Sequence, residues 1–438
     1  MRREFRMKKL SIVALAALLV IAMTIPAAAL ENEFGGYWRT RIFSQYDFTG
    51  EDETEARDLQ QWDTRTRLYY TAKLSPNLKF VNKFEFDSVW GGPSDSYGDI
   101  SADGIKVEIK NSYVDFKLAQ HRFEFGVQDF LLAKGYLFDD DAAGFKAIFK
   151  ASDAIYLPLI YIKGNEGGIG KSNDESNDDK DVDVLVLYPT IYLSKDTTIK
   201  PHVAWLTSEN YGGVWYNTDL PGTTELDAFT FGVEFDSKMD KFNFGATAIM
   251  QAGGVDIDPA YYGVYGNHDS LDMKGYLFDI YGGMTMGPAE LRAKALYASG
   301  NDENSITGDG EITAFFNPYG ASHYWAEIMG FGIFDNQASS GAPADQISNL
   351  MAFNLGTSFK VLESVKLSAD LWYAELAEDD AAGNSELGTE VDLMASFTII
   401  DNLKMDLVAA YLFAGDATYT GENDSDPYEF GTRLSLAF

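Results

Sequence analysis

The sequence predicts an all-β fold, a transmembrane antiparallel β-barrel of 18 strands with short periplasmic turns and long extracellular loops. Three observations point to it. The chain ends on an alternating strand, most of its length reads as strand pairs joined by tight turns, and short and long connections alternate. A side-chain period of two is the mark of a strand with two different faces. Membrane barrels of bacteria combine these three features.

The last stretch, 428–438, reads YEFGTRLSLAF and alternates along its whole length. Glu429 and Arg433 fall on one face, whereas aromatic and aliphatic side chains ending with Phe438 fall on the other. Eleven residues are enough to cross a bilayer as a tilted strand. An open sheet edge in lipid leaves backbone groups unsatisfied, so this strand is expected to pair with the first, 34–47. The alternative is an amphipathic edge strand of a soluble sheet.

The remaining strands are recognised by alternation and by polar turn residues between them. Each tight turn joins two strands, and a long polar loop separates one pair from the next. In chain order the predicted strands are 34–47, 60–74, 78–90, 105–118, 121–130, 145–150, 155–162, 182–193, 198–207, 226–235, 241–251, 276–286, 290–299, 350–360, 365–374, 388–399, 403–414 and 428–438.

The number and order of connections give the orientation. An even strand count puts both termini on one side, and short turns belong on the periplasmic side, so the acidic loops face outward. A barrel of 18 strands encloses too much space for side chains to fill. The expected arrangement is therefore apolar side chains toward lipid and polar side chains toward a lumen.

The totals exclude several classes of protein. The chain has 438 residues and no Cys, so disulfides and thiolate metal sites are excluded. It carries 67 acidic and 34 basic residues, a net charge of -33 that argues against nucleic acid as a partner. Aromatic residues make up 14% of the chain, which argues against disorder.

Residues 1–29 read as a secretory signal peptide. Lys8 and Lys9 precede the apolar run 10–25, and Ala27-Ala28-Ala29 matches a small-residue cleavage site. The barrel domain is then 30–438. The alternative is a retained membrane anchor.

The whole pattern resembles Gram-negative outer-membrane porin-type β-barrels. The motifs GGYWRTR (35–41), DTRTRLYY (63–70) and SPNLKF (75–80) are similar to the alginate-export-like group of eighteen-stranded barrels. The resemblance implies a location in the cell outer membrane, among lipid and lipopolysaccharide, and a channel for solutes. It also implies that Phe438 is part of the signal read by the barrel-assembly machinery. General porins are trimers and alginate-export-like barrels are usually monomers, so a homotrimer remains one of two options.

Basic residues on the early strands share the parity of the polar face. Arg39, Arg41, Arg65 and Arg67, called here the four early arginines, lie on the first two strands. Rings of charged side chains set the selectivity of a pore. The other basic residues predicted for this pore wall are Lys73, Lys79, Lys83, Lys106, Lys110, Arg122, Lys146, Lys150 and Arg433.

The third outer loop, 129–144, contains Asp139, Asp140 and Asp141. In general porins this loop folds into the lumen. By resemblance, these aspartates are expected to face the four early arginines across a constriction. In the alternative, the loop lies outside and the arginines pair with acids of the wall, namely Asp63, Glu85 and Asp87.

Two other loop features stand out. Loop 301–349 is the longest and contains the apolar stretches ITAFFNPYG and HYWAEIMGFGIF. It is expected to plug the barrel mouth, to form a subunit contact or to pack on itself as an outer cap. The acidic loop residues 174–181 lack the spacing of an EF-hand calcium loop, and they are interpreted as solvated faces or as acids bridged to lipopolysaccharide by cations, with specific binding of divalent cations as the alternative.

The motifs of enzymes are missing from the sequence. None of the four His residues lies in a metal or triad spacing, so no catalytic residue, metal or cofactor is predicted. The leading function is passive diffusion of small hydrophilic solutes or ions. The alternatives are a selective channel or exporter for anionic solutes or polysaccharide, and a non-conducting structural or adhesin barrel.

Overall fold

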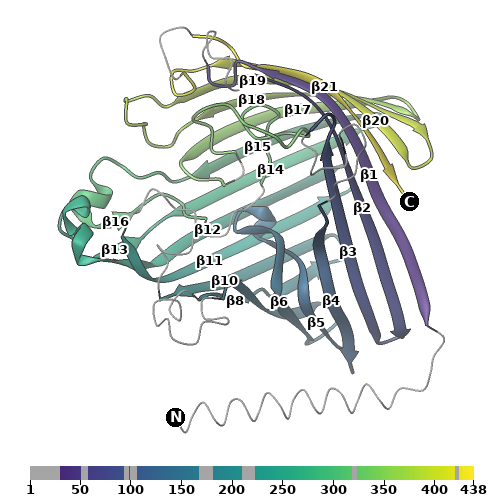
Figure 1. Cartoon of the computed structure of the whole chain (residues 1–438), viewed down its shortest axis with the longest axis horizontal. Helices are drawn as coiled ribbons and strands as arrows, with labels where there is room; N and C mark the ends of the chain where they lie inside the picture. Colours follow the sequence, from purple (N-terminus) through teal and green to yellow (C-terminus); the bar gives the residue numbers. More distant parts are fainter. Residues whose placement is uncertain are drawn as a thin grey trace.

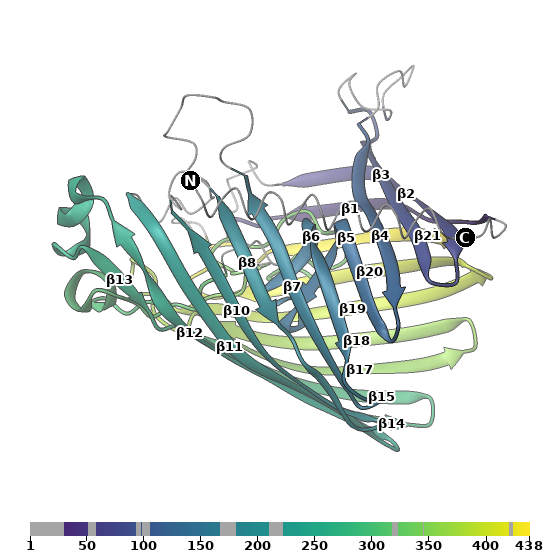
Figure 2. The same ribbon diagram turned by 90° about the horizontal axis from the view of Figure 1, so that it is seen from below.

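The computed structural model describes residues 30–50, 58–92, 98, 106–166, 181–209, 222–317, 323–344, 346–419 and 424–438. Its strands form one closed antiparallel barrel, because the first strand pairs with both the second and the last. Figures 1 and 2 show the tilted strands from two sides. The predicted signal peptide lies outside the described residues. No helix in the described part of the chain is long and apolar enough to cross a membrane.

The predicted count of 18 wall strands is confirmed. Among the described residues 21 strands are assigned, of which β8 and β9 are two parts of one wall strand and β13 and β16 belong to outer loops. Their bounds are β1 Glu31–Tyr46, β2 Leu59–Ser75, β3 Leu78–Val89, β4 Glu108–Leu118, β5 His121–Leu132, β6 Phe138–Lys150, β7 Ile155–Asn165, β8 Val182–Leu187, β9 Thr190–Ser194, β10 Thr197–Ser208, β11 Thr223–Met239, β12 Phe242–Ile257, β13 Ser270–Met273, β14 Tyr276–Met286, β15 Ala289–Ala298, β16 Glu311–Ile312, β17 Leu350–Leu362, β18 Val365–Glu375, β19 Glu386–Ile400, β20 Leu403–Ala414 and β21 Tyr428–Ala437.

The break between β8 and β9 falls at Pro189. Proline has no backbone N–H to donate to a ladder, so the pairing stops there and resumes at Thr190. Beyond the wall, β13 pairs in parallel with β16, and together with the 3₁₀ helix η4 (Pro259–Tyr265) and the π-helical turn η5 (Ser305–Asp309) they form a lobe at the loop end.

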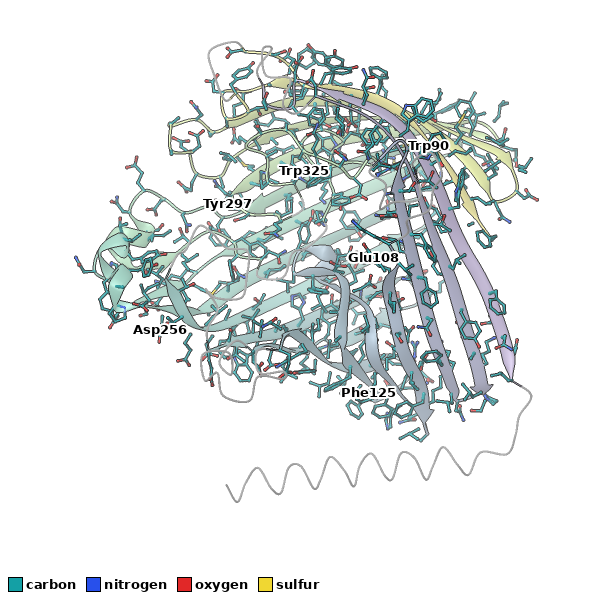
Figure 3. The ribbon with its side chains drawn as sticks, viewed as in Figure 1. Trp90, Glu108, Phe125, Asp256, Tyr297 and Trp325 are labelled. Atoms are coloured by element: carbon teal, nitrogen blue, oxygen red, sulfur yellow. The ribbon has the colours of Figure 1, made fainter. Side chains whose placement is uncertain are left out.

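The outward face is apolar, as the alternation predicted. Phe231 is 48% exposed and Phe430 50% exposed, whereas Glu429 next to Phe430 is 1% exposed. Phe125, labelled in Figure 3, belongs to the same outer surface. This band of exposed aliphatic and aromatic side chains can only be covered by lipid tails or by another apolar surface.

The closing seam joins β1 to β21, as predicted, and the register of this pairing sets Arg41 opposite Arg433. The Gly36 N–H donates to the Phe438 carbonyl at 2.8 Å, and the Phe438 N–H donates to the Gly36 carbonyl at 3.1 Å. A Cβ on Gly36 would lie 2.4 Å from the Phe438 ring. Glycine at position 36 therefore allows the last residue of the chain to reach the first strand.

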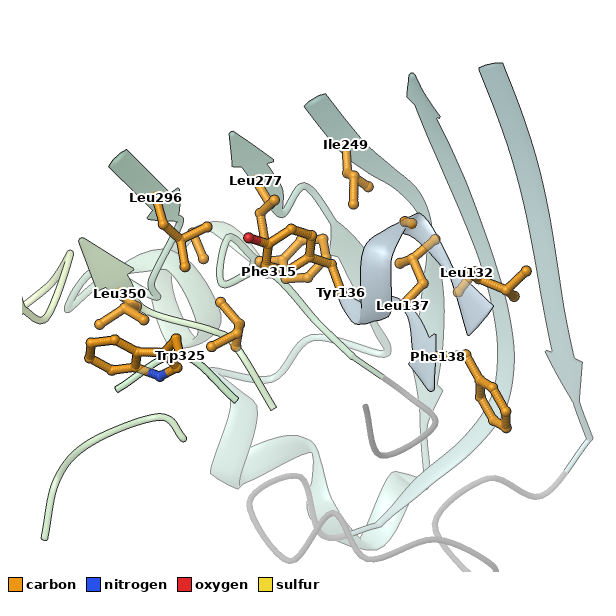
Figure 4. Packing of buried hydrophobic residues seen from close by; sticks show 14 of the residues in the cluster. Leu132, Tyr136, Leu137, Phe138, Ile249, Leu277, Leu296, Phe315, Trp325 and Leu350 are labelled. Carbon is orange, nitrogen blue, oxygen red and sulfur yellow. The ribbon is translucent and has the colours of Figure 1, made fainter. Parts of the chain in front are cut away.

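The interior differs from the predicted all-polar lumen. Toward the loop end, the inner side of β8, β14, β15 and β17 carries buried Val184, Leu277, Leu296 and Leu350. Figure 4 shows side chains of two inward-folded loops packed against this wall. Periodicity alone cannot distinguish apolar positions that face lipid from apolar positions that face a loop inside the barrel.

Candidate pore constriction

Two loops fold into the barrel and meet. The first loop, Ala133–Leu137, follows β5 and begins with the 3₁₀ turn η2 (Ala133–Gly135). The second loop is the described part of 313–349. The Tyr136 ring stacks on His323 at a centroid distance of 4.0 Å, and Asn317 donates to the Tyr136 carbonyl at 2.8 Å. The two loops thus form one bridge inside the barrel.

The first loop reaches well beyond its own strands. Lys134 lies 3.0 Å from Asp236 on β11, and the Ala133 N–H donates to the Tyr188 hydroxyl between β8 and β9 at 3.0 Å. Its sharp turn requires positive φ at Ala133 (51°) and Lys134 (57°), which is unfavourable for side-chain-bearing residues. Burial of Tyr136 and these polar contacts hold the turn in place.

His323 lies at the junction of the two loops. Its Nδ1 is 3.1 Å from the Lys134 carbonyl, and its Nε2 is 3.3 Å from the ammonium group of Lys294 on β15. Burial, together with the positive charge of Lys294, lowers the pKa of His323 to about 3. The imidazole is therefore neutral at physiological pH.

The second loop also reaches the opposite wall, on β1 and β19. Phe334 is fully buried and stacks on Phe43 at 4.7 Å, and Asp335 lies 3.4 Å from Arg39. The Ile328 and Met329 N–H groups donate to Glu390 on β19 at 2.7 and 2.9 Å. Of the predicted roles of this loop, a lumen plug agrees with these contacts.

The four early arginines line the inner wall, where parity placed them. Arg41 makes a two-bonded pair with Asp63 at 2.8 and 2.7 Å, and Arg65 bonds Asp87 through its Nε at 2.8 Å. Arg67 bonds Glu85. Two parallel N–H···O bonds make the Arg41 pair a strong contact. These pairs are those of the alternative prediction, in which the arginines are neutralised within the wall.

The predicted position of the three aspartates opposite the arginines is wrong. Asp139, Asp140 and Asp141 belong to β6, which pairs with β5 as part of the wall. Asp141 lies 3.1 Å from Lys110 on β4 and accepts from Asn111 at 2.8 Å. The sequence DDDAAG has low strand propensity, but pairing with a complete neighbouring strand overrides propensity. Asp335 of the long loop takes the position expected of these aspartates.

The other predicted pore residues are also paired with acids. Lys79 lies 3.0 Å from Asp115, Lys83 lies 2.9 Å from Asp129, and Arg433 lies 2.9 Å from Asp406. Arg122 lies 2.8 Å from Asp115 and 2.6 Å from Glu124. The inner surface of β1 to β6 therefore carries basic and acidic side chains in pairs and is not purely basic.

Sequence reasoning missed the residues at the junction. Lys134, Tyr136 and His323 come together only through the two loops, and Lys294 faces them from β15. A cavity of about 480 Å³ lies beside them, lined also by Asp279, Arg292 and Trp325. The apolar composition of the long loop was the available signal, and it does not say which residues reach the wall.

No metal centre is evident. Among the described residues, no three His, Cys, Asp or Glu side chains are grouped so that they could hold a metal ion. The acidic stretch 174–181, apart from Asp181, lies outside the described residues.

Comparison with solved structures identifies the class of fold. OccK8 (OprE) of Pseudomonas aeruginosa superposes with a TM-score of 0.57 at 12% identity, covering 93% of this chain and 98% of that one. OpdK of the same organism, solved with vanillate, gives 0.57 at 11% identity over 93% and 98%. Another structure, of the outer membrane protein OpdK, gives 0.56 at 11% identity over 93% and 99%. The protein has the fold of these outer-membrane β-barrels.

A comparison of the sequence with models of protein families identifies the family. The family model described as alginate export matches residues 172–432, more than half of the chain, so the chain belongs to the alginate export family. A search of curated proteins finds no match.

Proposed function

We propose that the protein is an outer-membrane channel that lets small hydrophilic solutes or ions diffuse passively, narrowed by its two inward loops. The observation that carries the proposal is the contrast inside the barrel. One wall, β1 to β6, is lined with polar and charged side chains, and the loops are packed against the other. Charged walls and constrictions of this kind set which solutes pass a pore.

Two polar cavities, one beside the junction of the loops and one at the wall of β1 to β3, support a hydrophilic path. One of about 480 Å³ lies beside Lys134 and His323, and one of about 290 Å³ lies beside Arg39 and Arg65. Both have polar and charged linings, which suits solutes that carry hydrogen-bonding groups. The predicted pore residues of β1 to β5 contribute to this wall as pairs of opposite charge, so we expect weak selectivity between anions and cations.

A selective channel for anionic solutes or polysaccharide is the second candidate. The family description, alginate export, and the vanillate in one OpdK structure favour it. Each names an anionic compound. Against strong anion selectivity, the basic residues predicted to line the pore are paired with acids, and an incoming anion has to compete for them.

A liposome swelling assay separates these candidates. Purified full-length protein in liposomes should admit small neutral sugars at a rate that falls steeply with their size. A channel restricted to anions would admit sugar acids and exclude neutral sugars of the same size. Liposomes that admit neither neutral sugars nor sugar acids would support the non-conducting structural or adhesin barrel.

The biogenesis and surroundings of the barrel remain proposals as well. Residues 1–29 are proposed to be a signal peptide that is removed, and Phe438 to be read by the barrel-assembly machinery. Contact with lipopolysaccharide and a homotrimeric state stand on resemblance. The exposed apolar band extends around the described strands, with no break that marks a subunit interface.

A further inference from the structure

Arg39 differs from the other early arginines in the source of its counter-ion. The other three pair with carboxylates of the neighbouring strand. Arg39 lies opposite Arg65 on β2 and opposite Ser435 on β21, so its register offers it no acid. Like charges directly opposite each other destabilise a strand pair. The carboxylate that offsets them comes from Asp335, 296 residues further along the chain.

Asp335 makes only long contacts with Arg39 and Arg65. Its Oδ2 lies 3.4 Å from Arg39 Nη2 and 4.0 Å from Arg65 Nη1, whereas a good charge-assisted bond measures about 2.7–2.9 Å. The buried Nε of Arg39 makes no hydrogen bond to any described residue. The other oxygen of Asp335 accepts from the Tyr324 hydroxyl at 2.8 Å, which holds the carboxylate away from a two-bonded geometry.

The residue beside Asp335 fixes the loop to the same wall. The Phe334 ring stacks on Phe43 and packs against Val408. A Cβ on Gly431 would lie 2.6 Å from the Phe334 ring, so glycine leaves the space that the ring fills. Arg41 donates to the Phe334 carbonyl. One aromatic ring, one hydrogen bond from Arg41 and one loosely held carboxylate thus attach the loop tip to β1.

A cavity beside the same arginines provides space for a small ligand. Its volume is about 290 Å³, and its lining includes Arg39, Arg41 and Arg65 together with Lys106. This volume lies just below the range of about 300–1,000 Å³ for small-molecule sites, so it suits a small solute. Asp63 and Asp87 also line it, but they already pair with Arg41 and Arg65.

We infer that Asp335 is an autoinhibitory carboxylate, which a small solute carboxylate displaces from Arg39 and Arg65 so that the loop tip leaves the wall and the path widens. The inference rests on the proposed channel function. A free carboxylate can accept from Nε and Nη2 of Arg39 together, the fork geometry that Asp335 does not reach. The solute that widens the channel is then one that carries the same chemical group as the residue it replaces.

The test is single-channel recording of full-length protein in planar bilayers, with glucuronate as the probe and glucose as its neutral match. Millimolar glucuronate in potassium chloride of physiological ionic strength should raise the wild-type conductance severalfold, and glucose should leave it unchanged. Asp335→Asn removes the charge and keeps the size. This variant should show the raised conductance without any addition and no further response to glucuronate.

Glu303→Gln is the matched control, because Glu303 is an exposed acid of the same connection between β15 and β17 but lies outside the inward part. It should behave like the wild type. A charge swap, Arg39→Asp with Asp335→Arg, should restore the low basal conductance and lose the response to glucuronate. If Asp335→Asn conducts and responds like the wild type, the inference is overturned while the channel stands. If no variant conducts, the proposed function itself fails.

Discussion

The two sides of the lumen hold the inward loops by different forces. On the side of β8 to β17, Tyr136 of the first loop and Phe315 of the second belong to one buried apolar cluster with the wall. On the side of β1, the second loop is held by Phe334 and by the ion pair of Asp335. Fully burying one large apolar side chain contributes about 1.5–3 kcal/mol, and a partly exposed ion pair about 0–1 kcal/mol.

The difference teaches which contact can be released. Burial of apolar surface is non-directional, spread over many residues and insensitive to salt. The ion pair is local, screened by salt and open to competition from another anion. Both walls hold the bridge by apolar burial, and the ion pair of Asp335 at β1 is the contact that a competing anion can release. The four predictions below test this contrast, starting with the largest expected effect.

A charge on the apolar side should break the anchor. Leu277→Asp places an unpaired carboxylate where Leu277 is fully buried under the loops. We expect a loss of about 3–5 kcal/mol in unfolding free energy, measured by denaturant titration in detergent micelles. Leu277→Met, which keeps the volume and polarity, should cost less than about 1.5 kcal/mol. Equal stability of the two variants would contradict an apolar anchor.

Removing the ring at the junction should loosen the bridge. Tyr136→Ala deletes a fully buried side chain that stacks on His323. We expect a loss of about 3 kcal/mol, by analogy with aromatic truncations in cores, and a severalfold rise in conductance. Tyr136→Phe keeps the ring and should match the wild type in conductance. An unchanged conductance in Tyr136→Ala would mean that the solute path avoids the junction.

The long loop should be held more firmly in acid. Burial and the nearby Glu390 raise the pKa of Glu327, on the loop, to about 7 from the ordinary carboxyl value. The docked loop thus binds a proton more tightly than a released one. Its stability is fully present below the ordinary carboxyl pKa and is lost as pH rises through about 7. Conductance should rise between about pH 5 and pH 9 in the wild type and stay flat in Glu327→Gln.

Charges on the wall of β1 to β3 should have the smallest effect. Arg65→Ala with Arg67→Ala leaves Glu85 and Asp87 without their partners. The reversal potential in a salt gradient should shift modestly toward cation preference, because two acids become available to mobile cations. Asp87→Asn should shift it in the opposite direction. A zero shift in both variants would show that these pairs lie away from the ion path.

Much of the fold could be predicted from the sequence because lipid imposes a strict pattern. The 18 wall strands, the pairing of the last strand with the first and the outward position of Phe430 follow from alternation and turn residues. The same pattern placed the early arginines on the inner face. At these positions the polarity of each side chain matches the face of the barrel on which it lies, so the sequence pattern predicts that face correctly.

The constriction could not be predicted because its contacts join distant segments. Asp335 meets Arg39 and His323 meets Lys134 only after both loops fold inward, and no local period encodes these pairs. The prediction for the three aspartates 139–141 failed because local composition was given too much weight. Their polar sequence indicated a loop, but the segment pairs with β5 and is part of the barrel wall. Resemblance to general porins suggested an inward third loop and an acid facing the arginines, but not which residue supplies that acid.

The central claim is that the two inward loops narrow an otherwise conducting barrel. Single-channel conductance of the wild type and of Tyr136→Ala, recorded with reversal potentials in planar bilayers, tests it most directly. The account predicts discrete small steps with weak ion preference in the wild type and larger steps in the variant. Absence of steps in both proteins, or steps of equal size, would contradict it.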